Sequence, residues 1–167
     1  MTLGTLFRFV AMRRKDSLVD ELDRKILVEL QRDATVALED IAKRVGSSKT
    51  PVWNRVRKMR EAGVIERTVA IVNPEAVGLG STFYVLVRTS EHEKGWLEKF
   101  VAAVNKHPEI VSAHRLAGDI DYILKVQVAD AKAFDAFYQS LIDDVSIFNV
   151  TSLMSMEQIK ATTELPL

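Results

Sequence analysis

The sequence predicts an α+β protein in which a winged helix-turn-helix domain precedes a ferredoxin-like βαββαβ domain with an antiparallel sheet. Three observations lead to this prediction. Apolar residues recur at helical spacing in three segments between residues 18 and 62. Strand and helix patterns alternate through 81–160. Between the two regions, a β-branched stretch stops at Asn73-Pro74, where proline ends a central strand.

The composition is that of a folded protein with an uneven distribution of charge. Of the 167 residues 47% are hydrophobic, which is enough to build packed cores. The absence of cysteine excludes disulfides and thiolate sites and is compatible with the cytoplasm, where we expect the protein to act. Residues 41–70 carry eight Lys and Arg against two Glu, a net charge of +6, whereas 90–167 carry seven against twelve acidic residues, a net charge of −5. This asymmetry favours a polyanion-binding part joined to a part with another task.

Residues 1–17 are expected to be a disordered extension, and Met12 is an alternative to Met1 as the natural start. The apolar part of this segment is too short to span a bilayer, which takes about 20 residues. Its positive charges follow the apolar stretch, which argues against a signal peptide. We therefore expect no membrane partner.

Three helices are predicted in the first domain, residues 18–72. The first extends to Arg32-Asp33 and the second stops at Gly46. The third begins after Ser47-Ser48, tolerates Pro51 in its first turn, and ends at Ala62-Gly63. Their buried stripes are Leu18, Leu22, Ile26, Leu27 and Leu30, then Leu38, Ile41, Ala42 and Val45, then Val52, Val56 and Met59. Short joints between such helices are typical of a helix-turn-helix, although an ordinary basic surface helix fits the third segment about equally well by itself.

The second domain, residues 81–160, follows a predicted strand over 64–72 and a linker over 73–80. Its elements are strands at 82–88, 110–116, 122–128 and 147–156, with helices around Trp96–Val104 and Phe134–Leu141. Residues 161–167 are left as a tail. One face of the sheet would stay uncovered and expose apolar side chains, which self-association would bury.

Several ordered motifs make the chain resemble the leucine-responsive/asparagine-operon (Lrp/AsnC, feast/famine) family over about residues 18–160. They are Leu22-Asp23-Arg24-Lys25-Ile26-Leu27, Asp40-Ile41-Ala42, the stretch from Ser48 to Arg57, Gly63-Val64-Ile65 and Gly118-Asp119-Ile120-Asp121-Tyr122. The resemblance implies an oligomeric transcription regulator. Its first domain would bind operator DNA, and its second would assemble the oligomer and sense an amino acid or related metabolite.

Candidate DNA-binding residues lie on and just before the third helix. Lys49, Arg55, Arg57 and Lys58 suit phosphates or guanine edges, and Asn54 suits adenine. Thr50 and Ser48 can contact phosphate or cap the helix, and we expect Ser48 mainly to be a cap. Trp53 is expected to pack beneath the helix. Arg60 and Arg67 can be simply solvated.

Candidate effector-binding residues surround the predicted turn between the middle strands. Asp121 can pair with the ammonium of an amino acid, and backbone N–H groups near Gly118 can bind its carboxylate. An ordinary β-turn is the alternative, favoured without the family resemblance. The family commonly has Thr where Ala117 stands, and because Ala117 lacks the hydroxyl, this departure puts one ligand contact in doubt. The full candidate set is Leu116, Ala117, Gly118, Asp119, Asp121, Tyr122, Thr151 and Ser152.

No other motif predicts a site. His92, His107 and His114 lack metal-ligand spacing, so neither a metal nor a cofactor other than the effector is expected. No nucleophile–base arrangement is visible, and we expect no enzyme.

The sequence thus predicts a sequence-specific DNA-binding regulator whose oligomeric state or DNA affinity responds to an amino acid. Its partners would be double-stranded operator DNA, the effector and further copies of the chain, in a dimer, a tetramer or an octamer. The alternative is a metabolite-binding module that modulates a partner protein without binding DNA. The effector, the operator and the sign of regulation are not specified by the sequence.

Overall fold

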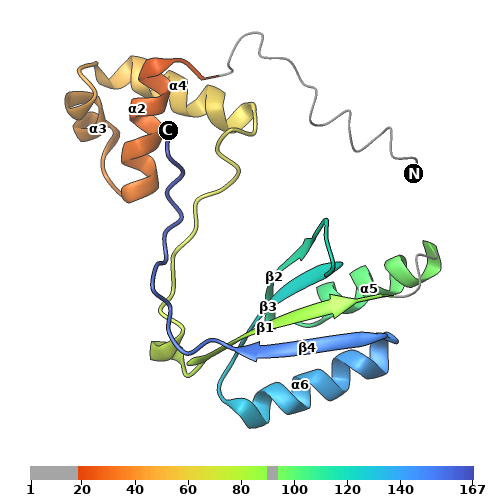
Figure 1. Cartoon of the computed structure of the whole chain (residues 1–167). Coiled ribbons are helices and arrows are strands. Elements are labelled where there is room, and N and C mark those ends of the chain that lie inside the picture. Colours follow the sequence, from red (N-terminus) through yellow and green to blue (C-terminus); the bar gives the residue numbers. More distant parts are fainter. Residues whose placement is uncertain (1–18, 90–93) are drawn as a thin grey trace. The chain divides into compact units, whose positions relative to one another are not determined.

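The computed structural model describes residues 19–89 and 94–167, which form two compact units (Figure 1). The first unit comprises 19–70 together with Ala161–Leu167, and the second comprises Ile71–Lys160. The predicted extension at 1–17, including Met12, lies outside the described residues, as does His92. No helix in the described ranges is both long and apolar enough to cross a membrane.

The first unit is a trihelical bundle, as predicted, made of α2 (Glu21–Arg32), α3 (Leu38–Arg44) and α4 (Lys49–Glu61). Asp20 begins α2 with a capping box. Its carboxylate accepts from the backbone N–H of Asp23 at 2.9 Å, and the Asp23 carboxylate accepts from the N–H of Asp20 at 3.0 Å. Apart from Leu18, which lies outside the described residues, the predicted stripes meet in one core, whose buried side chains are Ile26, Leu27, Ile41, Ala42, Val52, Val56 and Met59.

The turn between α3 and α4 depends on Gly46. Its φ of +70° is a left-handed conformation that costs glycine little, and it lets the Ser47 N–H return to the carbonyl of Ala42 at 2.8 Å. The chain therefore reverses within a few residues, and α4 packs against α3 and α2 through Val52, Val56 and Met59.

The strand predicted over 64–72, and with it the wing, is not formed. After α4 the N–H groups of Val64 and Ile65 both donate to the carbonyl of Met59, at 2.8 and 3.1 Å, and the chain then runs on as an exposed connection. β-Branched residues favour an extended backbone, but a strand also needs a neighbour to hydrogen-bond with. The four strands of the described residues form one sheet in the second unit, and none of them pairs with 64–72.

The carboxy-terminal tail belongs to the first unit. The side-chain amide of Gln31 on α2 accepts from the Leu165 N–H at 2.7 Å and donates to the Leu165 carbonyl at 3.3 Å. Arg32 lies 3.9 Å from the carboxylate of Glu164. The sequence predicts only a tail for residues 161–167, whereas the structure packs this segment on the helical bundle.

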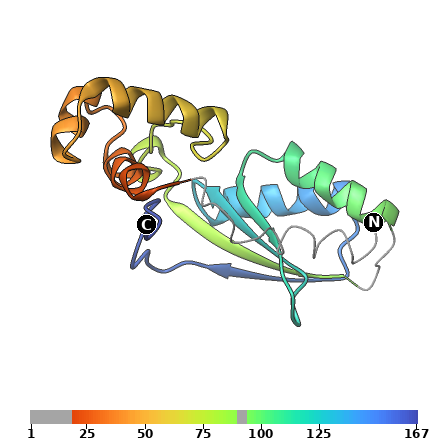
Figure 2. The same ribbon diagram turned by 90° about the horizontal axis from the view of Figure 1, so that it is seen from above.

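The second unit is the predicted βαββαβ fold, which Figure 2 shows from above. In chain order it contains β1 (Ser81–Arg88), α5 (Lys94–Lys106), β2 (Ile110–Arg115), β3 (Tyr122–Val128), α6 (Ala131–Asp144) and β4 (Asn149–Met154). A short 3-10 turn, Glu75–Val77, precedes β1. The strands lie in the order β2-β3-β1-β4 and every neighbouring pair is antiparallel, which confirms the ferredoxin-like prediction.

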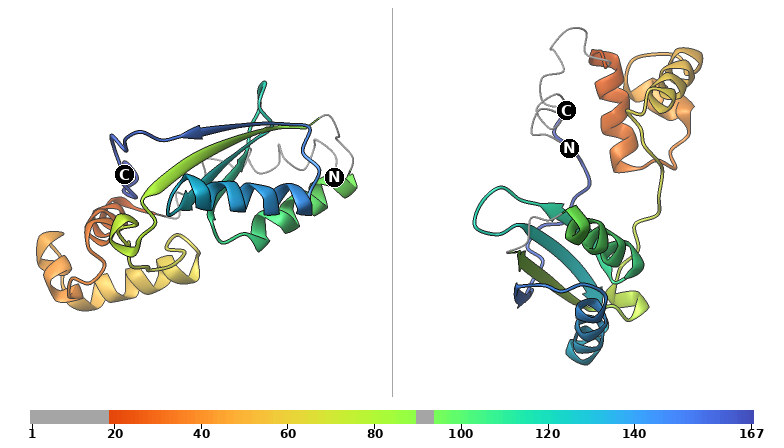
Figure 3. Two further views of the ribbon diagram at one scale, coloured as in Figure 1. Left: turned by 90° about the horizontal axis from the view of Figure 1, so that it is seen from below. Right: turned by 90° about the vertical axis from the view of Figure 1, so that its right-hand side faces the viewer.

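Helices α5 and α6 cover one face of this sheet (Figure 3). Alternate residues of β1 and β3 point toward them, and the predicted stripe of Tyr122, Leu124, Val126 and Val128 is buried. The helices contribute Trp96 and Phe100 from α5 and Phe137 and Leu141 from α6. The core thus follows the strand and helix periodicities of the sequence.

The opposite face of the sheet carries the other set of alternating residues. Leu86 of β1 is paired with Ile123 of β3 and with Thr151 of β4, and Tyr84 is paired with Leu153. Residues paired across strands have their side chains on the same face. The side chains of Tyr84, Leu86, Ile123 and Leu153 are therefore neighbours on the open face. Leu153 is 50% exposed. In a single chain this face is an apolar patch without a helix over it.

Candidate functional site

The outward side of α4 is fixed by its inner side. Because Val52, Val56 and Met59 are buried, the exposed residues of the helix lie away from the bundle. Of the predicted DNA-binding residues, Asn54 and Arg55 are half-buried, and the others are exposed: Ser48, Lys49, Thr50, Arg57 and Lys58. Most of the predicted set thus lies on or next to one solvent-facing surface.

Ser48 occupies the cap position of α4 with an extended backbone, but its side chain makes no capping hydrogen bond. The expectation that its hydroxyl mainly caps the helix is therefore not met. The hydroxyl stays exposed, as do the first residues of α4, Lys49 and Thr50. Backbone N–H groups in the first turn of a helix have no intrahelical partner and favour anions.

Arg55 points back toward the start of α2. Its guanidinium lies 2.5 Å from the Asp20 carboxylate and 2.9 Å from that of Asp23, whose side chain is only 12% exposed. The hydrogen bonds that the guanidinium donates to these two carboxylates, that to Asp23 first, raise the pKa of Arg55. Without DNA, then, Arg55 holds α4 against α2; its predicted contact with DNA stays a prediction. The Asp20–Asp23 spacing is a sequence signal for the start of α2 and does not by itself indicate Arg55 as a partner.

Asn54 and Lys58 line a groove of about 550 Å³ that Asp20, Asp23 and Arg55 also line. The two carboxylates reduce the positive charge on this side of α4. On the other side lie Lys49 and Arg60, which form no ion pair with the described residues. Lys49 and Arg60 are therefore basic side chains of α4 that lie away from these two carboxylates.

Trp53 does not pack beneath α4, so this expectation was wrong. Its side chain is 48% exposed, and the guanidinium of Arg57 lies over its ring, 4.8 Å from the centroid. Arg57 also approaches Glu61, with Nε 3.7 Å from Oε1. The inner face of α4 is filled by smaller side chains, and the indole is left on the outward surface.

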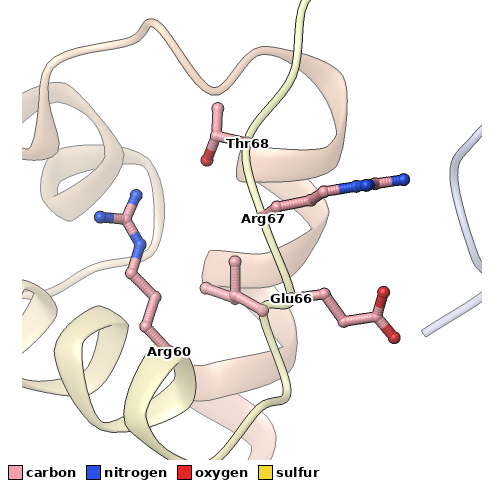
Figure 4. Close-up of a pocket in the computed structure, with 5 residues that line it drawn as sticks. Arg60, Glu66, Arg67 and Thr68 are labelled. Carbon is pink, nitrogen blue, oxygen red and sulfur yellow. The ribbon is translucent and has the colours of Figure 1, made fainter.

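A second pocket follows the end of α4, lined by Arg60, Ile65, Glu66, Arg67 and Thr68 (Figure 4). The side chains of Arg60 and Arg67 extend in different directions in this view. Because their guanidinium groups do not converge, the pocket is not arranged as an anion site, and the expectation that both are solvated fits this geometry.

The predicted effector loop connects β2 to β3. The Leu116 N–H donates to the Asp121 carbonyl at 2.8 Å and closes the hairpin. Asp121 also ties the loop to β1: its N–H donates to the Val87 carbonyl at 3.0 Å, and its carboxylate accepts from the Thr89 N–H at 2.8 Å. Gly118 has a φ of +151°, a value that residues with a side chain rarely adopt. The carboxylate is thus held at the end of β1, beside an exposed loop that includes Leu116, Ala117, Gly118 and Asp119.

The remaining effector candidates fall on different faces of the sheet. Tyr122 is buried against the rings of Phe100 and Trp96 on the helix-covered face. Ser152, which is paired with Val85, lies on that same face, and Thr151, paired with Leu86, lies on the open one. Two neighbouring residues predicted to line one cleft therefore point to opposite sides.

A separate charged cluster lies where α5 and α6 end. The ammonium of Lys106 lies 2.7 Å from the Asp144 carboxylate, and Nε2 of buried His107 lies 2.9 Å from it. Hydrogen bonds from Lys106 and His107 lower the pKa of Asp144. Among the described residues no group of three or more His, Asp or Glu is placed to hold a metal ion.

Comparison with known families assigns both units. The AsnC-type helix-turn-helix domain matches residues 19–60, and the Lrp/AsnC ligand binding domain matches 82–165. The two matches cover both units of the fold in the predicted order.

Individual relatives agree over nearly the whole chain. The DNA-binding transcriptional activator DecR of Escherichia coli K12 is 42% identical over 151 residues, which are 90% of this chain and 99% of DecR. An AsnC family transcriptional regulator from Agrobacterium tumefaciens has a crystal structure with a TM-score of 0.86 and 49% identity, covering 89% of this chain and 97% of that one.

A third similar protein, a transcriptional regulator of Neisseria meningitidis, was solved in complex with L-methionine. It shares 32% identity and a TM-score of 0.84, over 89% of this chain and 96% of its own. The trihelical unit, the βαββαβ unit and these likenesses together show that the chain belongs to the Lrp/AsnC family of DNA-binding transcriptional regulators.

Proposed function

We propose that this regulator contacts operator DNA through the outward side of α4. The observation that carries the proposal is the exposed row of Lys49, Thr50, Arg57 and Lys58 on a helix whose other side is locked in the bundle. In helix-turn-helix proteins the second helix of the motif, which is α4 here, lies in the major groove, and its first residues contact base edges. Salt-dependent phosphate contacts would come from the lysines.

Within this interface we assign different tasks to different residues. Ser48 and the free N–H groups of the first turn bind phosphate. Asn54 and Arg57 contact bases, since an amide pairs with adenine and a guanidinium with guanine. Arg55 serves mainly to position α4 through its ion pairs with Asp20 and Asp23.

We propose that the second unit senses an amino acid at an interface between copies of the chain. The exposed Leu116–Asp119 loop supplies N–H donors, Asp121 supplies the anion for the ammonium, and Thr151 contributes a hydroxyl from the open face. The L-methionine bound to the Neisseria meningitidis regulator supports this class of ligand. The apolar open face around Leu86 supports a homo-oligomer of at least two chains.

The remaining proposals follow from the role of a DNA-binding regulator that responds to an effector. The protein would act in the cytoplasm and without catalysis, and its one small-molecule partner would be the effector. An effector changes DNA affinity only if it binds one assembly better than another. Oligomer formation and effector binding are therefore expected to be linked.

The test is binding of the purified full-length protein to DNA from upstream of its own gene, titrated with salt and repeated with a panel of amino acids. Arg57→Ala and Lys58→Ala should each weaken binding roughly tenfold, and Lys58→Ala, which removes a phosphate contact, should also reduce the salt slope by about one. Lys99→Ala, an exposed lysine of α5, is the matched control and should change neither. Effector binding without any DNA affinity, there or in a genome-wide selection, would favour a protein-modulating module instead.

A further inference from the structure

Trp53 differs from the other tryptophan of the chain in its surroundings. Trp96 is 7% exposed, packs against Phe100 and Tyr122, and donates its indole N–H to the Ser146 carbonyl at 2.6 Å. Trp53 is 48% exposed on the outward side of α4. Its ring is not among the buried side chains of the bundle core, which are smaller. A large indole at such an exposed position could contact a molecule that binds to α4.

The indole and Arg57 form a pair one helical turn apart. The guanidinium carbon lies 4.8 Å from the ring centroid, within the range of a cation–π contact. Its Nε also lies 3.7 Å from Oε1 of Glu61. An arginine that already contacts a ring and a carboxylate loses less rotational freedom when it binds a base than a free arginine does.

The neighbours of Trp53 on this side of α4 indicate what the partner is. Lys49, Thr50, Arg57 and Arg60 lie four residues before, three before, four after and seven after it, on the same side of the helix. An apolar protein groove would have to desolvate these groups, whereas DNA supplies phosphates for the cations. Trp53 is also the fifth of the thirteen residues of α4, in the half of a recognition helix that reaches base edges.

We propose that Trp53 and Arg57 together recognise a thymine next to a guanine in the major groove, an inference that rests on the proposed DNA-binding role of α4. The apolar edge of the indole covers the C5-methyl group of thymine, and the guanidinium donates to O6 and N7 of guanine. Neighbouring bases on one strand are about 3.4 Å apart, so a ring and a guanidinium in contact suit one dinucleotide step.

The test begins with a random duplex pool, from which full-length wild-type protein selects its preferred sequence. Each thymine of that sequence is then replaced by deoxyuridine, which lacks only the methyl group. At a thymine beside a guanine, wild-type affinity should fall about fourfold per half-site, the effect of one buried methyl group. Replacing the adjacent guanine by 7-deazaguanine should also weaken wild-type binding, but not binding of Arg57→Ala.

Variants assign the effect to the side chain. Trp53→Ala should bind the thymine and deoxyuridine duplexes equally, with an unchanged circular dichroism spectrum because the ring is not part of the core. Lys58→Ala, which loses a phosphate contact, should weaken both duplexes and keep the fourfold ratio.

Three results would overturn the inference while leaving DNA binding by α4 intact. They are a selected sequence without a thymine–guanine step, a wild type indifferent to every deoxyuridine, and a Trp53→Ala protein that keeps the fourfold ratio. The deoxyuridine scan uses wild-type protein and so does not depend on the folding of any variant. Failure of the wild type to select any sequence would instead overturn the role of α4 in DNA binding, and this inference with it.

Discussion

At the scale of single residues, the charged side chains of α4 have two different environments. Arg55 is paired with Asp20 and Asp23, whereas Lys58, one turn of helix nearer the end, forms no ion pair with the described residues. The Asp23 side chain is 12% exposed, and a carboxylate with so little water relies on its cation. Basic residues that look alike in the sequence thus differ in the structure, since Arg55 holds two helices together and Lys58 is left without an ion pair to a described residue.

We expect Arg55→Met to destabilise the first unit by about 1–3 kcal/mol, because it leaves the Asp23 carboxylate without its charged partner. Urea unfolding followed by circular dichroism measures the change. Lys58→Met is the matched control and should stay within about 0.5 kcal/mol of wild type. Equal stability of the two variants would show that the Arg55 ion pairs do not hold α4.

Asp144 provides a pH dependence of stability in the second unit. Lys106 and His107 lower the pKa of Asp144 in the folded protein below its ordinary value of 3.8. Folding therefore releases protons from this carboxyl group when the pH is near 3.8. The stabilisation is complete above 3.8 and is lost as the pH falls through the lowered pKa. The unfolding temperature of wild type should therefore exceed that of Asp144→Asn at neutral pH, and the difference should shrink below about pH 4. A difference that is constant down to about pH 2 would contradict the assignment.

At the scale of elements, the chain passes between its two units twice. The first passage is the exposed connection after α4, and the second brings residues 161–167 back to α2. Gln31 binds the Leu165 peptide through both its amide nitrogen and its oxygen, much as a neighbouring strand would. The tail is therefore an element of the DNA-binding unit, although it follows the sensing unit in sequence.

Gln31→Ala should free the tail by removing both hydrogen bonds to Leu165. We expect the backbone amide of Leu165 to exchange with deuterium about fivefold faster, the size of one net hydrogen bond. Hydrogen exchange of the carboxy-terminal peptide, read by mass spectrometry, measures this. Lys25→Ala, which breaks the Lys25–Glu21 pair on the same helix, should leave the exchange unchanged. Slow exchange that survives Gln31→Ala would mean that other contacts hold the tail.

At the scale of the whole molecule, the open sheet face is the surface through which we propose that the protein assembles. Tyr84, Leu86, Ile123 and Leu153 are neighbours there, with Thr151 beside them. Apolar patches of this kind on a regulator are normally covered by a partner surface. A second copy would cover them symmetrically, and it would bring Thr151 to the same interface.

Leu86→Asp should shift the oligomer toward monomers, because a carboxylate would be buried without a partner at the centre of this face. Sedimentation velocity across a protein dilution series measures the shift, which we expect to be at least about tenfold in the dissociation constant. Ala102→Asp places the same charge on the exposed side of α5 and should leave the assembly unchanged. An oligomer that tolerates Leu86→Asp would have to assemble through another surface.

Much of the fold was predictable from the sequence. The three helices, the four strands and the buried stripe of β3 follow from the periodicity of apolar residues, and the family was recognisable from motifs such as Gly118–Tyr122. The prediction of a strand at 64–72 was wrong, because extended propensity says nothing about a pairing partner. The DNA-binding and effector-binding residues themselves remain predictions, although Asn54, Lys58 and Asp121 do lie where such contacts are possible.

The order of the elements and their buried faces follow from the sequence, since helix and strand periodicity are local properties of the chain. The neighbours of each surface residue follow from the tertiary structure alone. It paired Arg55 with Asp20 and Asp23, left Trp53 outside, turned Thr151 and not Ser152 to the open face, and returned the tail to Gln31. These outcomes depend on contacts between residues that are distant in sequence. Such contacts are set by the packing of the elements and cannot be read from the local sequence pattern.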